Sequence, residues 1–256
     1  MVVFSASAYA TPLFLTARDI GVGKSEIAGF WGTDHNAGGS NADGSTYTDR
    51  QGLNLRYLYG LADRVNVFLA YSLDSYPNFP FFGQDTATPG VDLATKVISG
   101  NSYSLGIKYA YLKATEGYPL DIAFLLGYQN TSATFNARSS ALSYNKDWTE
   151  GHAGWSAGCI CSRKIQALTP YFALGYGQRN TFEYKYPISG GTYPSISQSS
   201  ILINLGIEYE LLNDLSTALE YQYENTWGQQ AQSSAWKVDP SQASFSGVYL
   251  ALKYKI

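Results

Sequence analysis

Apolar and polar side chains alternate with a period of two along most of this chain of 256 residues. Between residues 201 and 211 every odd-numbered position is apolar or aromatic, and the stretches 103–111 and 248–256 repeat the pattern. Side chains two residues apart share a face of a β-strand, whereas an amphipathic helix needs a period near 3.6, which no stretch shows. The chain is therefore predicted to consist of strands that each have one apolar face.

Ten such stretches are separated by polar segments. We expect strands near residues 25–32, 52–61, 65–74, 101–112, 118–135, 151–162, 168–182, 199–211, 215–227 and 243–256. Short turns at 62–64, 114–117, 163–167 and 212–214 alternate with long polar connections at about 33–50, 75–100, 136–150, 183–198 and 228–242. An even number of strands with alternating short and long connections predicts an all-β, antiparallel up-and-down barrel of about ten strands. Eight and twelve strands are the alternatives, because a further pair could lie in 75–100.

The composition indicates what surrounds the two faces of each strand. Charged residues make up 14 % of the chain, against about 25 % in typical soluble domains. The face opposite the apolar one carries mostly Gly, Ala, Ser, Asn and Thr, which suit the crowded interior of a narrow barrel better than a water-facing surface. No stretch has the roughly 18 consecutive apolar residues that a membrane-spanning helix needs. We therefore expect a transmembrane β-barrel with lipid against its apolar faces.

Aromatic residues gather near the ends of the predicted strands. Tyr118 and Tyr128 have the same parity and lie ten positions apart, which is roughly 33 Å of strand, or about 25 Å of height at the usual tilt. That height matches the apolar band of membrane-spanning barrels, at whose borders amphipathic rings are favoured. The expected membrane-interface aromatics are Trp31, Tyr59, Tyr71, Tyr103, Tyr111, Tyr118, Tyr128, Trp155, Tyr176, Tyr209, Tyr223, Trp227 and Tyr254.

The first ten residues have the pattern of a secretory signal. They are largely apolar and end in Ala8-Tyr9-Ala10, which fits the small-x-small rule for signal cleavage but lacks a preceding basic region. We interpret residues 1–10 as the remnant of a signal peptide and 11–256 as a single barrel domain. The alternative is that 1–10 form an apolar first strand.

Two turn segments and the last strand resemble those of known barrels. Residues 59–65 read Tyr-Gly-Leu-Ala-Asp-Arg-Val and residues 209–215 read Tyr-Glu-Leu-Leu-Asn-Asp-Leu. Both resemble the Tyr-x-Leu-(Thr/Asn)-Asp-x-(Leu/Val) periplasmic hairpins of small Gram-negative outer-membrane barrels of the OmpA and OmpW type. Residues 248–256 resemble the closing strand that the barrel-assembly machinery recognises, with Ile256 where the family usually has Phe. The resemblance implies the outer membrane as location, its lipid and the assembly machinery as partners, and no particular activity.

The sequence gives little indication of other partners or of a cofactor. A net charge of −3 and a pI near 5.4 argue against nucleic acid as a partner. Cys159 and Cys161 fall on one face of a predicted strand and are expected to be small apolar fillers. Residues 78–82 form an apolar cluster in a long connection that could fold inward, touch lipid or contact a surface ligand. We expect no cofactor and no metal.

Candidate catalytic groups are sparse. A rim protease of the omptin kind needs paired Asp residues and an Asp-His pair, and neither Asp34-His35 nor residues 150–152 reproduce that spacing. A rim lipase needs a base next to its nucleophile, but His152 and Ser156 are about 13 Å apart along a strand. The prediction is that the chain is no enzyme, with a rim hydrolase as the weakest alternative. Calcium ligands in the first long connection would be Asp34, Asp43 and Asp49, at a spacing that matches no known loop.

Charges on the inward faces are close to balanced. The basic members are Arg56, Lys108, Lys253 and Lys255, and the acidic members are Asp121, Glu208, Glu210, Glu220 and Glu224. In a narrow barrel, near-balanced charge favours internal ion pairs that constrict the interior, whereas one sign would favour an ion-selective pore. We therefore expect a non-catalytic barrel with a structural or surface-interaction role through its long extracellular connections. The alternative is a narrow porin-like channel for ions or small polar or amphipathic solutes, lined by the same residues.

Overall fold

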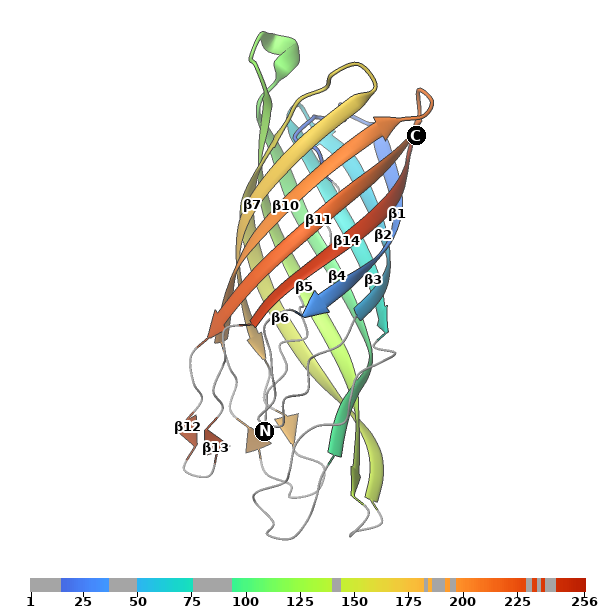
Figure 1. Ribbon diagram of the computed structural model, residues 1–256. Helices are drawn as coiled ribbons and strands as arrows, with labels where there is room; N and C mark the ends of the chain where they lie inside the picture. The colour runs from blue at the N-terminus through green and yellow to red at the C-terminus, as the bar shows by residue number, and fades with distance from the viewer. Residues whose placement is uncertain are drawn as a thin grey trace.

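The computed structural model describes residues 15–36, 50–75, 94–139, 144–181, 184–185, 192–193, 197–228, 232–233, 236–237 and 243–256. Within these residues ten tilted strands form a closed barrel (Figure 1). They are β1 (Ser25–Asn36), β2 (Arg50–Ala62), β3 (Val65–Ser75), β4 (Ala94–Leu112), β5 (Asp121–Ser139), β6 (Tyr144–Ser162), β7 (Leu168–Thr181), β10 (Ser197–Glu210), β11 (Leu215–Gly228) and β14 (Ala243–Lys255). Two small two-stranded sheets lie outside it, formed by β8 (Tyr184–Lys185) with β9 (Thr192–Tyr193) and by β12 (Gln232–Ser233) with β13 (Trp236–Lys237).

Every barrel strand pairs antiparallel with the next barrel strand in the chain. The barrel closes between β1 and β14, where Ile27 lies opposite Tyr254 and Trp31 opposite Leu250. Because β3 pairs directly with β4, the connection between them contributes no further barrel strand. The predicted up-and-down barrel of ten strands is confirmed.

The strand ends differ from the prediction on the long-connection side. The strand β4 begins at Ala94, and β5 and β6 stay paired as far as Ser139 and Tyr144, so much of the expected connections is strand. Neither face of these extensions is continuously apolar, and a period of two is visible only where one face is apolar. At the other end, Tyr118 precedes β5 instead of lying within it, so the estimate of band height that starts from Tyr118 counts residues outside the strand.

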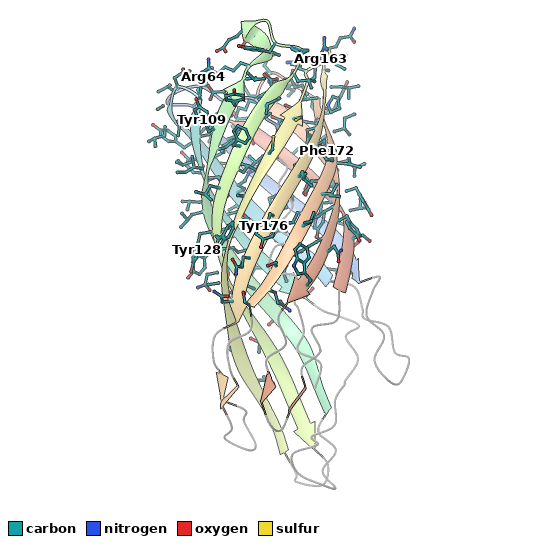
Figure 2. All side chains as sticks on the ribbon, turned by 90° about the vertical axis from the view of Figure 1, so that its left-hand side faces the viewer. Arg64, Tyr109, Tyr128, Arg163, Phe172 and Tyr176 are labelled. Carbon is teal, nitrogen blue, oxygen red and sulfur yellow. The ribbon has the colours of Figure 1, made fainter. Side chains whose placement is uncertain are left out.

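The two faces of the barrel wall differ sharply in exposure. Large apolar and aromatic side chains point outward all round the barrel (Figure 2), with Leu69 60 % and Leu126 57 % exposed. Their inward neighbours Ala70 and Leu125 are buried. One wide apolar face around a closed sheet is what a bilayer requires, since closure leaves no unpaired strand edge.

Outward aromatic rings lie toward both ends of the barrel. Figure 2 shows Tyr109 near the end with the short turns, and Tyr128 and Tyr176 toward the other end. On that second side the Tyr176 ring lies 5.7 Å from the Trp155 ring and 6.3 Å from the Trp227 ring. All the expected interface aromatics are exposed except Tyr59 and Tyr223, which are partly buried.

The short turns gather at one end of the barrel together with the C-terminus (Figure 1). The turn between β4 and β5 contains the 3-10 turn η1 (Ala114–Glu116). Arg64, whose φ is 66°, lies in the turn between β2 and β3. Its guanidinium lies 2.7 Å from the Glu116 carboxylate and so links this turn to η1. No helix in the described part of the chain is long and apolar enough to cross a membrane.

Candidate functional site

A chain of buried ion pairs lies inside the barrel. Arg56 on β2 contacts Glu26 on β1 at 3.2 Å, and Lys253 on β14 contacts the same carboxylate at 3.7 Å. Lys253 also donates a hydrogen bond to Glu208 on β10. All four side chains are at most 5 % exposed. Because basic and acidic side chains alternate along this row of ion pairs, their mutual attraction offsets the cost of burying each charge.

A second buried cluster continues the first around the wall. Glu220 on β11 accepts hydrogen bonds from the Tyr171 hydroxyl at 2.8 Å and from the Asn204 amide at 2.6 Å. The Tyr171 ring lies against Gly206, where any β-carbon would overlap it. Glycine at this position thus lets an aromatic ring lie flat on the inner wall and reach the carboxylate.

Residues 15–20 run inside the barrel at the short-turn end. Leu15 and Ala17 are buried, and they pack with Leu58, Leu125 and other inward side chains. The Lys108 ammonium donates hydrogen bonds to the Thr16 carbonyl at 3.1 Å and to the Arg18 carbonyl at 2.6 Å. Because these contacts come from β2, β4 and β5, the segment lies across the interior rather than along one strand.

The Asp19 carboxylate anchors this segment. It accepts hydrogen bonds from the Asn66 amide at 2.9 Å, the Gly21 N–H at 3.2 Å and the Arg64 N–H at 3.3 Å. The Lys113 ammonium lies 3.1 Å away. Burial by itself would raise the pKa of Asp19, but the hydrogen bonds and Lys113 outweigh it and lower this pKa below its ordinary value.

The other predicted interior charges lie nearer the ends of the barrel. Asp121 accepts a hydrogen bond from the Ala114 N–H at 2.8 Å and so holds the turn at η1. Glu210 and Lys255 are only partly buried and lie 3.9 Å apart at the short-turn rim, where Glu210 also contacts Arg18 at 3.3 Å. Glu224 is fully buried on β11.

Two members of the interior network are missing from the sequence prediction. Glu26 falls within the predicted strand 25–32 on the same parity as Ala28 and Phe30, so the alternation pattern could have identified it. Asp19 lies outside every strand, in a stretch without periodicity, and no sequence signal marks it.

The candidate catalytic groups receive no supporting geometry. Asp34 and His35 lie on β1 and His152 lies on β6, but their side chains are outside the described set. Residues 37–49, with the other calcium candidates Asp43 and Asp49, and residues 76–93, with the apolar cluster, are outside it as well. Residues 1–10 are outside it too. Among the described residues no group of three His, Cys, Asp or Glu side chains could hold a metal ion. Cys159 and Cys161 are free, half-buried thiols.

Comparisons with known proteins agree with this architecture. The family model of the OmpA-like transmembrane domain matches residues 178–253. The chain is similar to the β domain of the Bordetella autotransporter BrkA, with 11 % identity over 92 % of this chain and 100 % of that one and a TM-score of 0.51. It is also similar to the translocator domain of the autotransporter NalP from Neisseria meningitidis, with 10 % identity over 91 % of this chain and 88 % of that one and a TM-score of 0.50. At such identities the likeness shows the fold alone. No curated protein matches the sequence.

Proposed function

We propose that this chain, an outer-membrane β-barrel that resembles the OmpA-type barrels, is a non-catalytic envelope protein with a closed interior. The outer membrane surrounds the exposed apolar band, and the short turns then face the periplasm. The proposed role is structural or lies in surface interactions through the connections on the extracellular side. The C-terminal strand β14 is proposed as the part that the barrel-assembly machinery recognises.

The closed interior is supported chiefly by the segment 15–20. Its backbone carbonyls take up the ammonium of Lys108, a buried cation that would otherwise face an aqueous passage. A ten-stranded barrel is little wider than its own side chains require, so one extended segment fills much of its cross-section. A solute entering from the periplasm would have to displace this segment first.

The ion pairs support the same proposal. The interior carries both signs of charge, and these charges pair with one another, so a passing ion would not meet a lining of one sign. The paired side chains are Arg56, Glu26, Lys253 and Glu208. Channels select ions with rings of like charge or with carbonyl oxygens. This arrangement therefore favours a constriction over the narrow porin-like channel that remains the alternative.

Solute permeability distinguishes the two. We expect proteoliposomes that contain the purified, heat-modifiable barrel to swell in isosmotic arabinose no faster than protein-free liposomes. The reason is that the closed interior leaves no continuous aqueous path. Liposomes containing a general porin serve as the positive control. Swelling that increases with the amount of barrel inserted would support the channel instead.

A further inference from the structure

The segment 15–20 belongs to no strand of the barrel wall. The Ala17 N–H donates a hydrogen bond to the Ser162 hydroxyl at 3.0 Å. The Ile20 N–H donates one to the Asn66 side-chain oxygen at 3.2 Å. A wall strand is instead paired along its length with two neighbours, as β1 is with β2 and β14. Because the segment is held by side chains and not by such a ladder, it can leave the interior while the wall stays closed.

Two glycines join the segment to β1. Gly21 and Gly23 have φ of 89° and 75°, left-handed backbone angles that suit glycine. The Gly23 N–H donates a hydrogen bond to the Gly60 carbonyl on β2 at 2.8 Å. The Ser25 N–H donates one to the Ile256 carbonyl at 3.1 Å, so the chain is fixed to the wall from Gly23 onward. Hinges are a few residues that absorb large changes in φ and ψ, and the junction at Gly21 is a suitable hinge for the segment.

The Asp19 carboxylate ties the segment to the rim at the short-turn end. Its partner Arg64 lies in the turn between β2 and β3, and its partner Asn66 lies at the start of β3. Lys113 precedes η1 in the turn between β4 and β5. One side chain therefore joins the segment to two turns at once, and its loss would free this end of the segment.

The interior of the barrel carries more acidic than basic groups. Among the side chains that the structure describes, six acidic and three basic ones are buried. The acidic ones are Glu26, Asp74, Asp121, Glu208, Glu220 and Glu224, and the basic ones are Arg56, Lys108 and Lys253. Both signs are present, but the net charge of these buried groups is negative. Pores that are lined by acidic side chains favour cations over anions.

From these features we propose that residues 15–20 are a hinged plug that keeps the barrel closed, and that the barrel conducts small cations when the plug leaves. The plug turns about the junction at Gly21 towards the periplasm, and water then reaches the acidic interior. This open state rests on the proposed function, because the closed interior is the state in which Asp19 holds the plug in place.

Planar-bilayer recording of Asp19→Ala tests the plug. The unchanged barrel should stay silent, whereas Asp19→Ala should open in unitary steps, because the segment is no longer tied to the rim. In a KCl gradient the reversal potential of these steps should show a preference for K⁺. Glu220→Gln added to Asp19→Ala removes one interior carboxylate and should reduce that preference. Asp63→Ala is the matched control and should stay silent, since Asp63 contacts Lys113 but its side chain is 75 % exposed.

Each variant must first show heat-modifiable migration, which reports a folded barrel. If Asp19→Ala does not fold, Asn66→Ala is the substitute, because it removes both a donor to Asp19 and the acceptor of the Ile20 N–H. It should open in the same K⁺-selective steps. Silence of the folded variant, or steps that prefer Cl⁻, would overturn the plug but leave the closed interior standing. Steps from the unchanged barrel would contradict the closed interior as well.

Discussion

Replacing Lys253 by methionine should lower the free energy of unfolding by about 3–5 kcal/mol, the range measured when one partner of a buried ion pair is removed. The Lys253 side chain is 2 % exposed and contacts both Glu26 and Glu208. Methionine keeps most of its volume but no charge, so Glu208 would lose its buried cation. Guanidinium unfolding in detergent, followed by tryptophan fluorescence, measures the change.

The control lies two residues further along the same strand. Lys255 is 32 % exposed and lies 3.9 Å from Glu210 at the rim, where water screens the pair. Lys255→Met should therefore cost less than about 1 kcal/mol. Equal losses in the two variants would mean that the interior ion pairs do not stabilise the barrel more than rim charges do.

Replacing Asp19 by alanine should release the segment 15–20 from the interior without unfolding the barrel. The change removes the shared acceptor of the Asn66, Gly21 and Arg64 donors and the partner of Lys113. Hydrogen bonds to charged groups contribute about 1.5–3 kcal/mol, which corresponds to roughly 10- to 160-fold faster exchange of the segment's amides. Hydrogen–deuterium exchange of the Ala17 and Ile20 N–H groups, both hydrogen-bonded to side chains, measures it.

Asp63→Ala is the matched control, because Asp63 also contacts Lys113 but its side chain is 75 % exposed. Exchange in the segment should then stay within about twofold of the unchanged protein, as expected for an exposed pair. Unchanged exchange in Asp19→Ala would show that packing of Leu15 and Ala17, and not the carboxylate, holds the segment.

The barrel itself could be predicted from sequence because lipid imposes a strict pattern. Every residue of β10 that faces outward between 201 and 209 is apolar or aromatic, so the strand and its two faces follow from parity alone. The same parity places Arg56, Lys108, Glu208 and Lys253 inside. The outer-membrane location follows from this pattern and from the turn motifs, and is confirmed.

The pairing of these interior charges could not be predicted. Which cation meets Glu26 depends on the stagger between β2, β1 and β14, and alternation does not encode the stagger. The segment around Asp19 escaped prediction because its contacts are hydrogen bonds and ion pairs to parts of the chain that are distant in sequence, and such contacts leave no periodic pattern. The first part of β4, residues 94–100, escaped because neither of its faces is continuously apolar.

Planar-bilayer recording with the purified barrel tests the closed interior most directly. The barrel should insert, as judged by protection of its membrane band from protease, and should give no stable unitary conductance steps over minutes. Reproducible unitary steps from the unchanged protein that change in size with Glu220→Gln would contradict the closed interior and establish the narrow channel.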